Sequence, residues 1–290
     1  MSVASLAQTL APRFIPGDGA TLEERLGEDD GAALAILFTT DLRGNLDWCS
    51  CSLPRGGLAR RIGYLEGFKK KFKDTRVINV EAGELFYNST GFSPQVMLQN
   101  EQVARAYSRF PLDVVNLSRN DMLYAQRLLA REGLRERAAE MPVIRNVISA
   151  NAKLSSDTQS PAPYLIKEIT GPRIRGKKNK LRVGFVGLAE PSRSGTGNAD
   201  GLVRSIFETA RQIVPRLRSE CDVLVVVAHA ELKAAEQLAS ENPQADIVIA
   251  ADAGGILKPR QVGNTMIVSI APGDSQIGDI RVYLDKTGRA

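Results

Sequence analysis

The segment ALAILFTTDLRGNL, residues 33–46, joins an apolar run to a carboxylate and a guanidinium. Ala33 to Phe38 are all apolar, which predicts a buried strand. Ligands of α/β sheets bind beyond the carboxyl ends of the strands, so we expect Asp41, which follows this run, to belong to a functional site. Arg43 stands two residues later and is the unusual member, because an arginine does not lose its proton to become a metal ligand.

Short apolar runs alternate with helical patterns along the rest of the chain, which is typical of an α/β protein. We expect strands at residues 34–39, 76–80, 113–117, 143–149, 164–169, 181–186, 223–228, 246–250, 265–270 and 280–284. We expect helices at residues 57–73, 93–108, 121–140, 202–218 and 232–241, with Pro215 kinking or ending the fourth. Residues 1–30 should form an irregular extension, and residues 31–290 one α/β domain: a four-layer αββα sandwich with two facing mixed sheets.

The composition narrows the class of protein. The chain has 290 residues, 43% of them hydrophobic, and 38 Lys and Arg against 33 Asp and Glu give a formal charge of +5. This charge allows weak contact with acidic partners but is far below that of a dedicated nucleic-acid binder. No run approaches the roughly 18 apolar residues of a membrane span, and no signal peptide is visible. We therefore expect a cytoplasmic protein, or a periplasmic one if a signal has been removed.

The chain has a single histidine, His229, which excludes catalysis built on several imidazoles. It could be a metal ligand or simply a strand-end side chain that is hydrogen-bonded to a neighbour, and the lack of other imidazoles favours the second interpretation. Polar residues follow most of the predicted strands. The candidate pocket residues are Asp41, Arg43, Glu84, Arg119, Asn120, Asp121, His229 and Asp252.

The order and spacing of several segments resemble the metallophosphoesterase (calcineurin-like) superfamily, and within it the catalytic domain of the 5′-nucleotidase group. The segments are GGLARR (Gly56–Arg61), VINVEAGELF (Val77–Phe86), DVVNL (Asp113–Leu117), VISAN (Val147–Asn151), LVVVAHAEL (Leu224–Leu232), DIVIA (Asp246–Ala250) and the closing VGNTMIVSIAPGDSQIGDIRVYLD. The resemblance implies the sandwich fold, phosphoester hydrolysis and a site with two divalent metals. It covers about residues 34 to 290.

The metal-ligand motifs of this family are only partly present. The family carries D-x-H, G-D, G-N-H-[ED], a strand ending in His, and G-H-x-H. Asp41 and His229 match the first Asp and the strand-end His, Arg43 replaces the His of D-x-H, and Glu84 replaces the Asp of G-D. The remaining motif positions are occupied by Arg119 and Asn120, by Asp121, which keeps the acidic end, and by Asp252 and Gly254 in place of the last two His.

Arg43 and Arg119 argue against a bound metal. Two unit positive charges about 4 Å apart repel by about 4 kcal/mol at an effective dielectric constant near 20, and a divalent cation raises this further. We therefore expect no metal, no cofactor and no catalytic residue, with Arg43 and Arg119 bridging the carboxylates through bidentate hydrogen bonds. The predicted function is that of a non-catalytic metallophosphoesterase-like protein, a pseudo-phosphatase that serves as a structural or binding subunit of an assembly with protein partners.

Two other functions stay open. The chain could be a divergent metal-dependent phosphoester hydrolase, in which Asp41, Glu84, His229 and Asp252 hold one hard cation such as Mn or Mg. It could also bind nucleic acid or lipid through a basic surface, although charge runs of this kind are usually solvated faces. That surface would comprise Lys69, Lys70, Lys71, Arg175, Lys177 and Lys178. Cys49 and Cys51 could be idle thiols, a metal clip or a redox pair.

Overall fold

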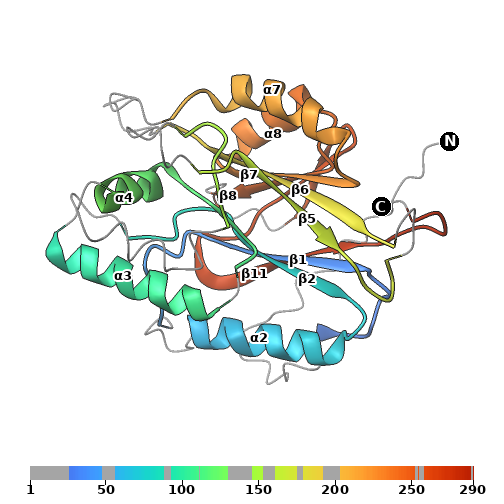
Figure 1. The fold of residues 1–290 in the computed structure, drawn as a ribbon, viewed down its shortest axis with the longest axis horizontal. Helices are drawn as coiled ribbons and strands as arrows, with labels where there is room; N and C mark the ends of the chain where they lie inside the picture. Colours follow the sequence, from blue (N-terminus) through green and yellow to red (C-terminus); the bar gives the residue numbers. More distant parts are fainter. Residues whose placement is uncertain are drawn as a thin grey trace.

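The computed structural model consists of two β-sheets packed face to face, with helices on both outer sides (Figure 1). It describes residues 26–47, 56–87, 93–110, 112–129, 146–152, 161–174, 179–191, 203–251, 254, 258–288 and 290. Helices α7 (Ile206–Arg218) and α8 (Leu232–Glu241) cover one side, and α2 (Leu58–Lys71) and α3 (Pro94–Arg109) cover the other. The predicted four-layer αββα sandwich is therefore confirmed.

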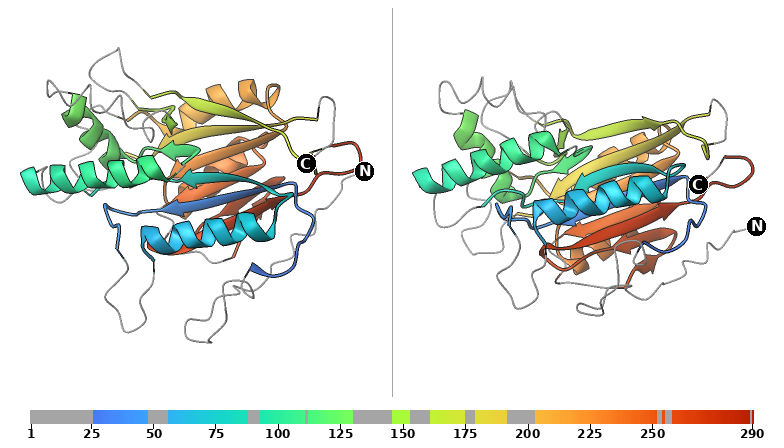
Figure 2. Two further views of the ribbon diagram at one scale, coloured as in Figure 1. Left: turned by 60° about the horizontal axis from the view of Figure 1, so that its bottom comes forward. Right: turned by 90° about the horizontal axis from the view of Figure 1, so that it is seen from below.

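The first sheet has the strand order β11-β1-β2-β3-β4. Strands β1 to β4 run parallel to one another, and β11 runs antiparallel to β1. Its strands are β1 (Leu34–Thr40), β2 (Arg76–Glu81), β3 (Val114–Asn116), β4 (Val147–Ile148) and β11 (Gly273–Val282). The carboxyl ends of β1 and β2 point toward the side of the molecule where α4 (Arg119–Leu129) lies (Figure 2). The residues that follow these strands are thus collected at one edge.

The second sheet has the strand order β5-β6-β7-β8-β10-β9. Its strands are β5 (Tyr164–Ile169), β6 (Leu181–Ala189), β7 (Val223–His229), β8 (Ile247–Ala251), β9 (Arg260–Val262) and β10 (Thr265–Val268). The four central strands are parallel, and β5 and β9 pair antiparallel at the two edges. β5 pairs antiparallel with β6, the next strand along the chain.

Alternation along β1 separates two hydrophobic cores. Leu34, Ile36 and Phe38 belong to the core between the two sheets, whereas Ala35 and Leu37 belong to the core beneath α2 and α3. Successive side chains of a strand point to opposite faces, so a strand that is apolar at every position must be covered on both. A third core lies between the second sheet and helices α7 and α8. Three cores between four layers explain the continuous apolar runs of the sequence.

The structure corrects several predicted boundaries. Strand β11 begins at residue 273 rather than 280, β9 was not predicted, and α4 begins at residue 119 rather than 121. The early part of β11 is polar and glycine-rich, so its pairing with β1, and not its own pattern, makes it a strand. Helix α7 begins at residue 206 and continues past Pro215, which is exposed and only three residues from the helix end.

Two further observations complete the fold. None of the helices in the described part of the chain is long and apolar enough to cross a membrane. The register between β1 and β11 shifts between Phe38 and Thr40, as in a β-bulge. Bulges bend a strand and re-aim its side chains. This one lies directly before Asp41.

Candidate metal centre

Three strands bring Asp41, Glu84 and His229 together at the carboxyl edges of the two sheets. Asp41 follows β1, Glu84 follows β2, and His229 is the last residue of β7 in the facing sheet. The parallel pairing of β1 with β2 continues into the loops, because Asp41 N donates to Gly83 O (2.9 Å) and Arg43 N donates to Glu84 O (2.8 Å). These main-chain bonds hold the two carboxylates in register.

The three side chains could hold one cation. Each offers one ligand atom, and these atoms all lie within 4.8 Å of one another. His229 Nε2 lies 3.3 Å from Asp41 Oδ1 and 3.8 Å from Glu84 Oε2. Two carboxylates and one imidazole suit divalent cations such as Mn²⁺. The fourth ligand proposed from the sequence, Asp252, lies outside the described residues, whereas the other three meet.

Arg43 lies beside both carboxylates. Its Nε donates to Glu84 Oε2 (3.0 Å), and its Nη2 lies 3.4 Å from Asp41 Oδ1. The side chain of Arg43 is 55% exposed, whereas that of Asp41 is fully buried. The guanidinium therefore lies at the solvent side of the group. It contacts one oxygen of each acid.

The backbone of this site is strained. Asp41, Arg43 and Glu84 have φ angles of 55°, 48° and 58°, and in the described part of the chain only Asn179 is a further non-glycine residue with positive φ. A non-glycine residue in this region costs of the order of 1–3 kcal/mol and persists only where the surroundings enforce it. Such strain concentrates at functional sites, and here it falls on three of the four charged residues.

Asp121 holds the loops in place from beneath. It is completely buried, and its two oxygens accept hydrogen bonds from Glu84 N (2.8 Å), Phe86 N (2.9 Å) and Ser118 N (2.9 Å). Asn120 Nδ2 donates to Glu84 Oε1. The negative charge of Asp121 is thus stabilised by main-chain N–H groups. Bridging of the carboxylates by Arg119 stays a prediction.

Opposite charges set the protonation of the site. Burial alone would raise the pKa of Asp41, but the hydrogen bond and the charge of His229 hold it well below its usual range. Burial alone would lower the pKa of His229, but the hydrogen bond to Asp41 and the nearby carboxylates raise it. Burial raises the pKa of Glu84, and its contact with Asp41 adds to this effect. The shifts favour the charged forms of both Asp41 and His229.

The sequence reasoning missed the residue that links the two sheets. Asn116 in β3 is completely buried, and its Nδ2 donates both to Ala82 O (3.0 Å) near Glu84 and to Leu188 O (2.9 Å) in β6. Next to this link, a Cβ atom at Gly83 would lie 2.8 Å from His229 Cδ2, so the absence of a side chain lets the imidazole approach. The available signal for Asn116 was a polar residue within the otherwise apolar run Val114–Leu117.

A second buried polar group was also missed. Glu81, the last residue of β2, accepts hydrogen bonds from Thr39 Oγ1 (2.6 Å) and Arg61 Nη1 (3.3 Å). Arg61 also lies 5.0 Å from the ring centroid of Phe110. Burial raises the pKa of Glu81 to about 7 despite the opposing charge of Arg61. These two hydrogen bonds tie the end of β2 to β1 and to α2.

No family model matches the chain. The chain is 25% identical over 233 residues to the trifunctional nucleotide phosphoesterase protein YfkN of Bacillus subtilis, an alignment of 74% of this chain and 15% of that protein. It is 29% identical over 220 residues to a 2′,3′-cyclic-nucleotide 2′-phosphodiesterase/3′-nucleotidase of Salmonella typhimurium, an alignment of 69% of this chain and 32% of that protein.

The solved structure of the calcineurin-like phosphoesterase YfkN from Bacillus subtilis superposes with a TM-score of 0.60, covering 88% of this chain and 87% of that one at 17% identity. The chain has the calcineurin-like phosphoesterase fold. The resemblance predicted from the sequence is thereby confirmed for the fold and for the kind of relative. The chain spans 15% of the length of the YfkN protein and 32% of the Salmonella protein. The activities of those proteins can therefore only be proposed for this chain.

Proposed function

We propose that the chain is a divergent metal-dependent phosphoester hydrolase that works with one divalent cation. The observation that carries this proposal is the convergence of Asp41, Glu84 and His229, whose ligand atoms lie within 4.8 Å of one another. Relatives that are phosphoesterases and nucleotidases support the same reaction class. The proposal departs from the non-catalytic function and from the absence of a metal that the sequence led us to expect.

The donors present fit one cation rather than two. The carboxylates of Asp41 and Glu84 and the imidazole of His229 are ligands that Mn²⁺ accepts readily, and Mg²⁺ accepts the carboxylates. Asn120 is engaged by its amide with Glu84, and Gly254 offers no side-chain donor. When bound, a divalent cation supplies Lewis-acid polarisation of a phosphoryl oxygen. Thr40 Oγ1 donates to Asp41 Oδ2 (2.8 Å) and so fixes the orientation of that carboxylate.

Arg43 would supply the positive charge that a second cation supplies elsewhere. A guanidinium binds phosphate through paired hydrogen bonds, and it is permanently charged. The Arg43 side chain is long and more than half exposed, so it can leave Asp41 and Glu84 and turn to a phosphoryl group while a cation takes those carboxylates. Such a fixed donor stabilises charge that develops on phosphoryl oxygens during hydrolysis.

The test is a paired measurement of metal content and turnover. The purified full chain is stripped with chelator and reloaded with Mn²⁺ or Mg²⁺, and hydrolysis of bis(p-nitrophenyl) phosphate and p-nitrophenyl phosphate is followed. We expect about one metal per chain and metal-dependent turnover that Asp41→Asn abolishes. Lys70→Gln, an exposed change on α2, should leave both unchanged. Turnover that persists in Asp41→Asn would refute the proposal.

One observation favours a second function, that of a non-catalytic binding subunit. Arg43 contacts both carboxylates, at 3.0 Å from Glu84 Oε2 and 3.4 Å from Asp41 Oδ1. In that case Arg43 is a permanent counter-ion, and the chain contributes surfaces to an assembly with protein partners. This function predicts no stoichiometric metal after reloading, no turnover with either substrate, and co-purification of a partner with the native chain.

A further inference from the structure

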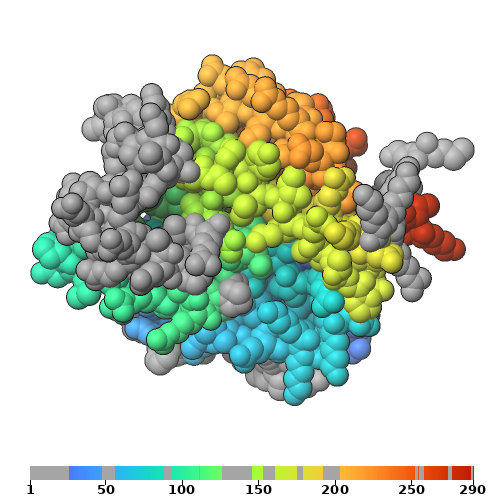
Figure 3. Space-filling model, in the orientation of Figure 1, coloured from blue at the N-terminus to red at the C-terminus, as the bar shows by residue number. Residues whose placement is uncertain are grey.

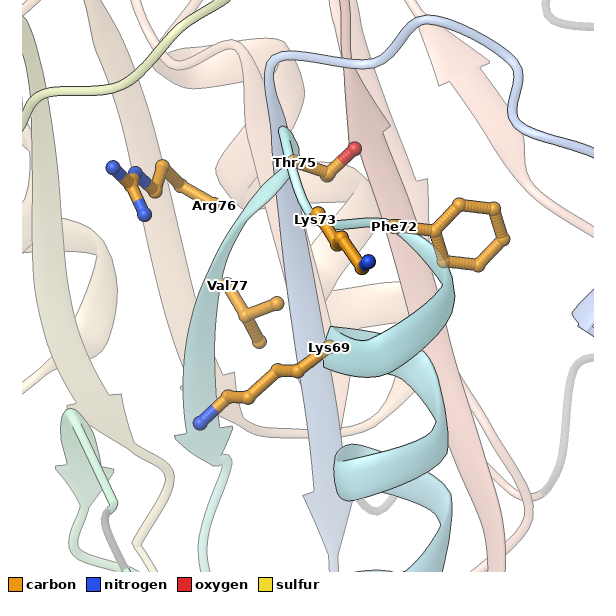
Figure 4. Close-up of a pocket in the computed structure, with 6 residues that line it drawn as sticks. All are labelled: Lys69, Phe72, Lys73, Thr75, Arg76 and Val77. Carbon is orange, nitrogen blue, oxygen red and sulfur yellow. The ribbon is translucent and has the colours of Figure 1, made fainter.

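A basic hollow lies at the opposite edge of the first sheet from the candidate metal centre. It has a volume of about 360 Å³ and is lined by Lys69, Phe72, Lys73, Thr75, Arg76 and Val77. These residues come from the end of α2, the turn after it and the start of β2 (Figure 4). β2 has its first residue here and its last near Glu84, so the two sites are separated by its length, roughly 20 Å.

Every ionisable residue that lines the hollow is a cation. Lys69 and Lys73 have no ion-pair partner within the described ranges, and both are exposed. Their side chains and that of Arg76 surround the start of β2, whereas the ring of Phe72 turns to the other side of the helix end (Figure 4). Phe72 is buried and contacts Arg281 there. The hollow therefore offers positive charge and no aromatic surface.

Arg76 is held in position by the neighbouring sheet. Its Nε donates to Thr170 O (2.7 Å), which lies 94 residues away in the chain, and Gly171 packs against the same side chain. This contact joins the end of β5 to the start of β2. In the space-filling view the β5–β6 hairpin lies directly beside the α2–β2 segment (Figure 3). The contact thus anchors Arg76 to the second sheet.

Helix polarity alone does not explain this arrangement. Cations are favoured in the last turn of a helix because they complement its dipole, and Lys69, Lys70 and Lys71 occupy that turn of α2. The same explanation does not cover Lys73 and Arg76, which lie beyond the helix. Only Lys69 of the three helical lysines lines the hollow, so Lys70 provides an internal reference.

We propose that this hollow binds a small anion that carries two or more phosphate groups. Three cations around one concave surface raise the local concentration of anions and match a charge that a single monoanion would not balance. A volume of about 360 Å³ is in the range of small-ligand sites. Because no exposed ring is available among the lining residues, the bound group is recognised through its phosphates and not through a stacked base.

Isothermal titration calorimetry with sodium pyrophosphate tests the proposal on the full chain. Chelator keeps the probe from bridging to a cation at Asp41, and low ionic strength keeps the screening of the charges weak. We expect one site per chain and about tenfold weaker binding in Lys69→Gln and in Lys73→Gln, because each removes one charged hydrogen-bond donor. Lys70→Gln removes the same charge from the same turn of α2 without touching the hollow. It should weaken binding by less than about twofold.

Three results would overturn the proposal. The first is the absence of binding heat in the wild type. The second is an equal loss in Lys69→Gln, Lys73→Gln and Lys70→Gln, which would show a diffuse field rather than a site. The third is co-sedimentation with phosphatidylglycerol vesicles that pyrophosphate does not displace, which would make the surface a membrane contact. None of these results depends on whether the chain hydrolyses phosphoesters.

Discussion

Charged side chains are buried and compensated at one end of β2 and exposed at the other. At the carboxyl end, Asp41 and Asp121 are buried, and each is compensated by His229, Arg43 or main-chain N–H groups. At the amino end, Lys69 and Lys73 are exposed and have no ion-pair partner in the described part of the chain. A buried charge is costly unless it is paired, whereas an exposed one is solvated by water. The acidic end is therefore fixed by the fold, and the basic end is free to meet a ligand.

The largest effect should come from Asp121 at the compensated end. Asp121→Ala leaves the N–H groups of Glu84, Phe86 and Ser118 without their acceptor inside the protein. We expect a loss of about 3–4 kcal/mol in the free energy of unfolding, measured by urea denaturation. Asp74→Ala, an exposed change beside the basic end, should cost less than about 0.5 kcal/mol. Equal losses in the two variants would remove the contrast between the ends.

Asn116 comes next, because it links the two sheets behind the site. Asn116→Ala removes the donor for the carbonyls of Ala82 and Leu188, and we expect a loss of about 2 kcal/mol. It should also weaken Mn²⁺ binding, since Glu84 and His229 belong to different sheets.

The matched control is Asn242→Ala, which removes a buried asparagine that donates to Leu238 O at the end of α8. This variant should lose stability without any change in Mn²⁺ affinity. If both asparagine variants bind Mn²⁺ as the wild type does, then Asn116 has a structural role only and does not position the ligands.

Arg43 is the exposed charged residue at the carboxyl end of β2. Arg43→Met should lower the stability of the metal-free protein by less than about 1 kcal/mol, since the guanidinium is 55% exposed and its ion pairs are screened by water. The same variant should bind Mn²⁺ at least about tenfold more tightly, because a positive charge beside the cation is gone. Calorimetry measures both effects, and unchanged affinity would contradict the idea that Arg43 and a cation compete.

The smallest effect is a pH dependence of stability in chelator. The lowered pKa of Asp41 contributes stability that is present above the ordinary carboxyl pKa, about 4, and is lost as pH falls through the folded-state value. The raised pKa of His229 contributes stability that is present below about pH 6.5 and is lost as pH rises through its folded-state value. The ion pair should therefore stabilise most between these limits.

The measurement compares wild type with His229→Gln in urea at a series of pH values. The difference in unfolding free energy should shrink as pH rises above about 6.5, because the variant lacks the imidazolium. Glu84 acts in the opposite sense, since its raised pKa opposes folding once it ionises. The charge of His229 lowers the pKa of Glu84, so the difference between the two proteins also contains a contribution from Glu84. A difference that is constant across this range would show that folding does not raise the pKa of His229.

Local sequence signals located much of the candidate site. The apolar run before Asp41, the Gly83–Glu84 pair after β2 and the apolar run that ends in His229 each predict a residue at a strand end, and the structure has all three there. Strand ends can be predicted because burial imposes an apolar pattern on the residues themselves. Asp252, Arg175, Lys177, Lys178, Cys49 and Cys51 lie outside the described residues, so those predictions stay predictions.

Other features had no local signal. The first half of β11 is polar, and it becomes a strand only because β1 offers it an edge, with Gly278 lying against the ring of Phe38. The charge state of the site depends on His229 and Asp41, which are 188 residues apart. Neither the pairing of distant strands nor the burial of a charge can be predicted from a short window of neighbouring residues.

By itself, the sequence determined most of the strands, the sandwich and the residue types at each strand end, because these follow from local patterns of burial. It did not determine β9 or the first half of β11. Only the tertiary structure decided which of those residues meet: Asp41, Glu84 and His229 at one edge, and Lys69, Lys73 and Arg76 at the other. The physical reason is that electrostatic and hydrogen-bond energies depend on distance and burial in three dimensions. Both are fixed by the contact between two sheets and not by spacing along the chain.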